Sequence, residues 1–76
     1  MKLGSKMYTL GQLLDTVCYG TKVRLANYGP SDIITEFTMS VDVEYKKEYE
    51  LVEPYIENEV MAVAITSDGT LYIEII

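Results

Sequence analysis

The first regular pattern in the chain has helical spacing and spans residues 9–19. Its apolar positions recur every three or four residues and define one face, made by Leu10, Leu13, Leu14, Val17 and Cys18. Thr9 and Gln12, three residues apart, match the pattern of a capping box at the start of a helix. Gly20 is a residue that commonly follows the end of a helix. The pattern therefore predicts a short amphipathic helix over residues 9–19, with Cys18 buried as a structural thiol.

Two alternating patterns follow this helix. Residues 22–26 alternate between charged and apolar side chains, which predicts a half-buried strand. A turn rich in Gly, Pro and Asp occupies residues 27–32. From residue 33 the odd positions carry Ile33, Thr35, Phe37, Met39, Val41, Val43 and Tyr45. This alternation predicts a second strand, antiparallel to the first, that continues to about Val41.

Residues 43–53 fit either of two structures. Tyr45, Tyr49 and Val52 form a stripe at helical spacing, and several good helix formers surround them. The rival interpretation continues the strand alternation through Tyr45, Lys47, Tyr49 and Leu51. We favour the helix, and Pro54 ends either element.

The strongest pattern is a hairpin at the end of the chain. Residues 60–66 and 70–76 are strand-like and flank Ser67, Asp68 and Gly69. Asp-Gly favours a two-residue type I′ turn. That register would place on one face Val60, Ala62, Ala64, Leu71, Ile73 and Ile75. The other face would then carry Met61, Val63, Ile65, Tyr72 and Ile76, with Glu74 among them.

These elements predict an α+β fold in the order αββαββ. Residues 7–76 would form a single small domain, with a four-stranded, mostly antiparallel sheet and two short helices packed on one face. Residues 1–6 are expected to be a flexible N-terminus or a cloning remnant. The predicted core comprises Leu10, Leu13, Leu14, Val17, Val23, Leu25, Phe37, Met39, Leu51, Val60, Ala62, Ala64, Leu71, Ile73 and Ile75.

Composition removes several classes of chemistry. The 76 residues include 12 Asp and Glu but 6 Lys and Arg, so the net charge is −6. This balance argues against nucleic acid or an anionic membrane as a direct ligand. The chain has no His and one Cys, which excludes a His base, a Cys–His dyad and an internal disulfide. No secretory signal is evident, so we expect a cytoplasmic protein without a cofactor or a metal.

Carboxylates and tyrosines are interleaved in the middle of the chain. The residues that combine them are Tyr45, Glu48, Tyr49, Glu53 and Tyr55. Aromatic rings supply affinity at protein interfaces, and carboxylates attract basic partners. The alternative is a solvated face that keeps a small domain soluble. We expect this set to form a protein-binding surface.

Two further segments carry a resemblance. The run of residues 20–25, Gly-Thr-Lys-Val-Arg-Leu, follows a leucine-bearing helix, and residues 68–75, Asp-Gly-Thr-Leu-Tyr-Ile-Glu-Ile, close the chain. In this the chain resembles small acidic proteins of unassigned function from bacterial phages and mobile elements. The resemblance implies an accessory role and no catalytic residues.

Three functional hypotheses remain. The first is a protein-interaction module that binds and modulates a host protein. The second is a self-assembling unit whose homo-oligomer interface is the second hairpin face, with Met61, Val63, Ile65, Tyr72 and Ile76, or the exposed edge strand. The third is an enzyme, which the missing His and the absence of a nucleotide-binding motif disfavour.

Overall fold

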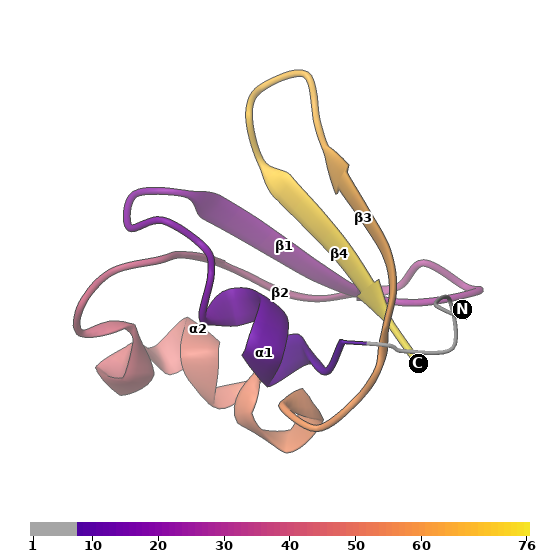
Figure 1. Cartoon of the computed structure of the whole chain (residues 1–76), viewed down its shortest axis with the longest axis horizontal. Helices are drawn as coiled ribbons and strands as arrows, with labels where there is room; N and C mark the ends of the chain where they lie inside the picture. Colours follow the sequence, from indigo (N-terminus) through magenta and orange to yellow (C-terminus); the bar gives the residue numbers. More distant parts are fainter. Residues whose placement is uncertain (1–7) are drawn as a thin grey trace, which may run out of the picture.

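The computed structural model describes residues 8–76 of the protein, so the N-terminus expected at residues 1–6 lies outside the described residues. It confirms the α+β fold and its element order (Figure 1). The elements are α1 (Leu10–Leu14), β1 (Lys22–Asn27), β2 (Ile33–Thr38), η2 (Val43–Tyr45), α2 (Lys47–Glu50), η3 (Glu53–Tyr55), β3 (Val60–Ile65) and β4 (Leu71–Ile75).

The four strands form one mixed sheet in the order β2-β1-β4-β3. Each hairpin is antiparallel, and the two hairpins meet through a parallel pairing of β1 with β4. The helical segment η2–α2–η3 connects the two hairpins and lies with α1 on one face of the sheet, while the tip of the β3–β4 hairpin extends beyond these helices (Figure 1). The core lies between the helices and the sheet, around Leu10, Leu25, Val52 and Ile73.

Helix α1 begins as the sequence predicts but ends early. The Thr9 hydroxyl accepts a hydrogen bond from the Gln12 N–H at 3.2 Å, and the Gln12 side chain accepts one from the Thr9 N–H at 3.0 Å. The helix stops at Leu14, where the Thr16 hydroxyl donates to the Leu13 carbonyl at 2.7 Å and satisfies it locally. Because the chain leaves the helical path here, Cys18 is exposed, and its predicted burial is wrong.

Strand β2 is also shorter than its alternating pattern predicts. It ends at Thr38, and the Met39 N–H makes a last hydrogen bond to the Thr21 carbonyl at 2.9 Å. The Ser40 hydroxyl then donates to Asp42 at 2.7 Å and turns the chain away from the sheet. Val41, predicted to continue the strand, is 82% exposed in this turn.

Residues 43–55 are helical, as favoured, but they form three short turns in place of one helix. Lys46 has an extended backbone between η2 and α2, which resets the helical phase. Val52 is buried and Tyr49 packs on the core, whereas Leu51, predicted to be a core residue, is 53% exposed.

The hairpin between β3 and β4 has a different register from the predicted one. The Thr66 N–H donates to the Thr70 carbonyl and the Gly69 N–H donates to the Thr66 carbonyl, each at 2.9 Å. The loop therefore has three residues and not two, with Gly69 in the left-handed region at φ +87°. Ile65 pairs with Leu71 as a result, whereas the predicted two-residue loop would have placed it opposite Tyr72, so that register is wrong.

This one-residue difference redistributes the side chains of the hairpin between the two faces of the sheet. Val63 and Ile65 share the helix-facing side with Leu71 and Ile73. The small side chains of Ala62 and Ala64, predicted for the core, lie on the other side with Tyr72 and Glu74, and Ala64 is exposed. The predicted division of the hairpin into two apolar faces is therefore wrong.

The face of the sheet without helices is instead polar. Arg24 forms an ion pair with its cross-strand neighbour Glu36. The Tyr72 hydroxyl donates to Glu74 at 2.6 Å, and the Ser31 hydroxyl donates to the same oxygen at 2.8 Å. These hydrogen bonds lower the pKa of Glu74 below its ordinary value, with Tyr72 contributing most. A hydrated face of this kind has no need of a covering layer.

Candidate functional site

A groove runs between α1 and the η2–α2–η3 segment on the side away from the sheet. Its volume is about 590 Å³ and it is open to solvent. The side of α1 contributes Thr9, Gly11, Gln12 and Asp15. The opposite side contributes Glu44, Tyr49, Glu53, Ile56 and Glu57. We call this feature the acidic groove, since four of its nine lining residues are carboxylates.

The width of the acidic groove is set at Gly11. Its N–H donates to the Ile56 carbonyl at 2.9 Å, which draws α1 against the turn after η3. A Cβ atom on residue 11 would lie 2.8 Å from Cγ2 of Ile56, closer than packed carbon atoms come. This close approach explains a glycine inside a helix, where the residue is otherwise unfavourable by about 1 kcal/mol relative to Ala.

Tyr49 forms the aromatic wall of the acidic groove. Its ring packs edge-on against the buried Phe37, with ring centroids 5.6 Å apart and an interplanar angle of 89°. Burial raises the pKa of Tyr49 above its ordinary value, and the carboxylates of Glu44, Glu53 and Asp15 raise this pKa further. The same three charges that disfavour a tyrosinate would stabilise a cation placed against the ring.

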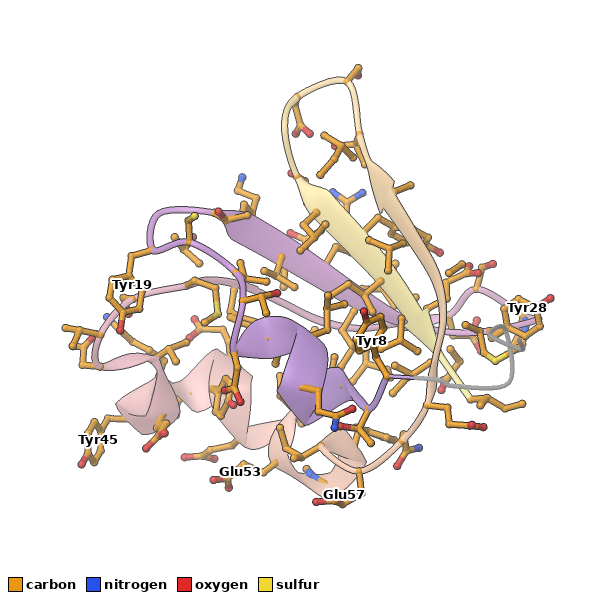
Figure 2. All side chains as sticks on the ribbon, in the orientation of Figure 1. Tyr8, Tyr19, Tyr28, Tyr45, Glu53 and Glu57 are labelled. Atoms are coloured by element: carbon orange, nitrogen blue, oxygen red, sulfur yellow. The ribbon has the colours of Figure 1, made fainter. Side chains whose placement is uncertain are left out.

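The carboxylates of the groove have no cationic partner among residues 8–76. The ion pairs within that range join Arg24 to Glu36 and Lys46 to Asp42, the latter at 4.0 Å. Neither pair includes a groove residue. Glu53 and Glu57 project from the same lower edge of the helical layer (Figure 2). The acidic groove is therefore a concave surface of uncompensated negative charge with an aromatic wall.

The structure brings together two of the five residues predicted for protein binding. Tyr49 and Glu53 line the acidic groove. Tyr45 is 87% exposed and extends away from the domain (Figure 2), while Tyr55 packs against the core. Glu48 points to the other side of α2. The predicted surface is therefore divided, because short helical turns direct neighbouring residues to different sides.

Glu48 lines a second cavity of about 470 Å³ beside β2. Lys22, Lys46 and Glu36 lie around the same cavity, together with Phe37, Thr38 and Ser40. Positive and negative side chains are mixed here, and Glu36 is already paired with Arg24. This cavity has neither the single sign of charge nor the isolated carboxylates of the acidic groove.

The residues predicted for an oligomer interface are also separated. Val63 and Ile65 are exposed on β3 and point to the helix-facing side of the sheet. Tyr72 lies on the opposite side, and the Ile76 N–H bonds to the Glu59 carbonyl at the far end of β3. Met61 lies at an irregularity in the pairing of β3 with β4. Only Val63 and Ile65 remain as a pair on one exposed surface.

Most of the charge of the acidic groove comes from residues that were not predicted to belong to a binding site. These residues are Asp15, Glu44 and Glu57. Glu44 and Glu57 belong to the acidic middle of the chain, but Asp15 lies about thirty residues earlier. No local spacing connects Asp15 to the others, since the contact between α1 and the turn after η3 brings them together.

Neither a metal site nor a membrane span is evident in residues 8–76. No group of three or more His, Cys, Asp or Glu side chains in that range is placed to hold a metal ion. None of the helices there is long and apolar enough to cross a membrane.

Comparison with protein-family models, with curated proteins and with solved structures finds no match to this chain.

Proposed function

We propose that this domain is a protein-interaction module that binds a basic segment of another protein in its acidic groove. One observation supports this proposal above the others. Four carboxylates without cationic partners among residues 8–76 line the groove beside Tyr49, and three of them raise the pKa of its hydroxyl. A Lys or Arg side chain entering the groove would meet opposite charge on both walls, and an aromatic ring whose face attracts cations.

The proposal assigns different roles to the residues of the groove. Tyr49 is the anchor, because its ring is fixed by Phe37 and loses little freedom on binding. Glu44, Glu53 and Asp15 attract the cation and orient it, and their charges make the encounter sensitive to salt. The Gln12 side chain is already held by the capping box, so it contributes a polar rim.

The wider setting of this module remains part of the same proposal. A cytoplasmic location, the absence of a cofactor and a binding role in place of catalysis are expectations from the sequence. An accessory role that modulates a host protein rests on the resemblance to small acidic phage and mobile-element proteins. The net charge of −6 supports a basic protein partner over nucleic acid.

The test uses a ten-residue lysine peptide as probe and titrates it into the isotope-labelled full chain. We expect NMR shift changes to concentrate at the groove residues, and the affinity to fall as salt rises. A ten-residue glutamate peptide of equal length serves as the opposite-charge control. Shift changes spread evenly over all acidic residues would contradict the proposal.

Matched variants separate the groove from charge in general. Glu53→Gln removes a groove carboxylate, and Glu50→Gln removes an exposed carboxylate of α2 that does not line the groove. We expect Glu53→Gln to weaken binding of the lysine peptide by at least about 1 kcal/mol, the usual threshold for an important contact. Glu50→Gln should change it far less, and equal effects of both variants would remove the groove from consideration.

Tyr49 requires a variant that keeps its packing. Tyr49→Ala would remove the ring that covers Phe37 and disturb the fold, so Tyr49→Phe is the informative change. If the ring is the anchor, Tyr49→Phe should retain most of the affinity for the lysine peptide. If a folded Tyr49→Phe variant no longer bound the lysine peptide, the hydroxyl of Tyr49, and not its ring, would be the group that anchors the peptide.

A further inference from the structure

Among residues 8–76, the outer edge of β3 is unpaired along most of its length. β3 lies at one end of the sheet and pairs with β4 alone. At its beginning the Val60 N–H donates to the Tyr8 carbonyl at 2.9 Å, and Thr9 bridges to Glu59. Beyond Val60, no segment within residues 8–76 pairs with this edge.

The hydrogen bonds of the hairpin show which backbone groups are directed outward. The Thr66 N–H donates across the hairpin to the Thr70 carbonyl. In an antiparallel pair such bonding positions alternate, so Ala64 also exchanges bonds with β4. The backbone N–H and C=O groups of Val63 and Ile65 therefore point away from β4, toward any strand that approaches the edge.

The side chains on this open edge are apolar. β3 has the sequence Val-Met-Ala-Val-Ala-Ile and carries no charge. Val63 is 49% exposed and Ile65 is 66% exposed, and both lie in the second half of β3. The tip of the β3–β4 hairpin extends beyond the helices (Figure 1). Open edge strands in soluble proteins usually carry a charged residue or a proline that discourages pairing. Residues 61–65 have neither, although a pairing irregularity lies near Met61.

We propose that β3 pairs antiparallel with β3 of a second copy of this chain, around a two-fold axis at Val63. In this register each Val63 lies opposite its own copy, and each Ile65 lies opposite Met61 of the second copy. A two-fold interface requires a surface that complements itself. An uncharged, apolar strand complements itself in this way. The outward N–H and C=O groups of Val63 would form hydrogen bonds with the C=O and N–H groups of Val63 in the second copy.

Charge favours a second copy over a basic partner at this surface. The carboxylates that would attract a basic segment line the acidic groove, and none lies on β3. Dimerisation nevertheless brings together two molecules of net charge −6, which repel at low salt. The dimer should therefore strengthen as salt rises, whereas binding of a lysine peptide in the groove should weaken. The two proposals can thus fail independently of each other.

The size of the contact determines the expected affinity of the dimer. A pairing of two short strands buries less than the roughly 1,200–2,000 Å² of a stable interface. A weak dimer, with Kd of the order of micromolar to hundreds of micromolar, is therefore expected.

The other edge strand, β2, carries Glu36 and is held against α2 by the Thr35 hydroxyl, which donates a hydrogen bond to the Glu48 carbonyl at 3.2 Å. A two-fold pairing uses the same strand of both copies, so the assembly closes at two copies.

The test is sedimentation equilibrium of the full chain over a range of concentrations at low and high salt. Val63→Lys places like charges opposite each other at the axis and should weaken the dimer at least tenfold. Val41→Lys is the matched control, since it makes the same change at a residue that is 82% exposed and distant in sequence from β3. Val41→Lys should leave the dimer as strong as in the unmodified chain.

A mixing experiment separates loss of pairing from loss of folding. Val63→Lys and Val63→Glu should each be monomeric alone and should form a heterodimer when mixed, because opposite charges then meet at the axis. Recovery of the dimer on mixing would support both the register and the folded state of the variants.

Four results would overturn the proposal. One is a full chain that stays monomeric up to about a millimolar, where even a weak dimer would form. Another is a dimer that Val63→Lys and Val41→Lys weaken equally. The third is a monomeric full chain that dimerises only when residues 1–6 are removed, which would assign the edge to the protein's own N-terminal segment. Assemblies larger than two would also contradict it.

Discussion

The two edge strands of the sheet, β2 and β3, have opposite surroundings. β2 is charged at Glu36, which pairs with Arg24, and it packs against α2 through the Thr35 hydroxyl and the contact of Phe37 with Tyr49. β3 has no charged residue, and its last three residues are exposed. Both strands have the same length and each is part of a short antiparallel hairpin, so hairpin geometry does not cause the difference.

The connections explain it. The chain leaves β2 through η2 and α2, and α2 contacts the strand at Thr35 and Phe37. The chain leaves β3 through a three-residue loop directly into β4, so no helix follows the strand. Within residues 8–76, one edge strand therefore packs against a helix, and the other has no segment beside its outer edge beyond Val60. The following changes test this contrast, beginning with the largest expected effect.

Phe37→Ala should strongly destabilise the edge at β2. Phe37 is 6% exposed, and its ring supports Tyr49 and through it α2. Removing a buried aromatic side chain costs about 3–5 kcal/mol. For a domain of this size such a loss approaches the whole free energy of unfolding. Urea denaturation of the purified variant measures the effect.

The matched change on the open edge is Ile65→Ala. Because Ile65 is largely exposed, we expect the free energy of unfolding of the monomer to change by no more than about 0.5 kcal/mol. The contrast between the two edge strands would be contradicted if Phe37→Ala and Ile65→Ala lowered the free energy of unfolding by similar amounts. In that event β3 would be integrated into the core as deeply as β2.

Gly69→Val tests whether the loop holds the open edge in register. Gly69 has φ +87°, which a β-branched residue resists, although a Cβ atom there would meet no neighbouring atom. We therefore expect a loss of more than about 1 kcal/mol that arises from backbone strain alone. Ser67→Val is the control, since Ser67 occupies the same loop without a positive φ. A urea midpoint that Gly69→Val leaves unchanged would contradict the assigned turn.

Asp68→Ala should give the smallest effect, and one that depends on pH. The Thr66 hydroxyl first, and then Thr70, donate to the Asp68 carboxylate and lower its pKa from 3.8 to about 2. A carboxyl whose pKa is lower in the folded state stabilises the fold above its unfolded pKa, and this contribution is lost as pH falls toward about 2.

The measurement compares thermal unfolding of the unmodified chain and Asp68→Ala between pH 7 and pH 2. The difference in stability should stay constant down to about pH 5 and then shrink. Ser67→Ala keeps the carboxylate and should follow the unmodified chain throughout. A difference between the unmodified chain and Asp68→Ala that grows on acidification would have the wrong sign for this network.

Local chemistry made much of the fold predictable. The Thr9 and Gln12 pair specifies the start of α1, and alternating residues specify β1. Gly69 marks the hairpin because few other residues adopt a positive φ. The loop length was not predictable in the same way, since a Gly after Asp suits both two- and three-residue loops. Because of this one-residue difference in loop length, the alanine side chains of β3 that were predicted to share a face with Ile73 lie on the opposite face of the sheet.

The candidate site was less predictable than the fold. Tyr49 and Glu53 were identified from composition, but short helical turns separate them from Tyr45 and Glu48. An extended backbone at Lys46 changes the helical phase, and nothing in the local pattern marks where such a break falls. A surface assembled from several short turns therefore cannot be inferred from spacing.

By itself, the sequence determined which segments become helices and strands, the sign of the net charge, and the chemistry that a chain without His cannot perform. Those properties follow from residue types and short-range periodicity. The tertiary structure alone decided that Asp15 joins Glu44 and Glu53 near Tyr49, and that β2 packs against α2 while β3, among residues 8–76, pairs with β4 alone beyond Val60. Both depend on contacts between residues far apart in the chain, such as Gly11 with Ile56, and packing fixes these only when the whole domain has formed.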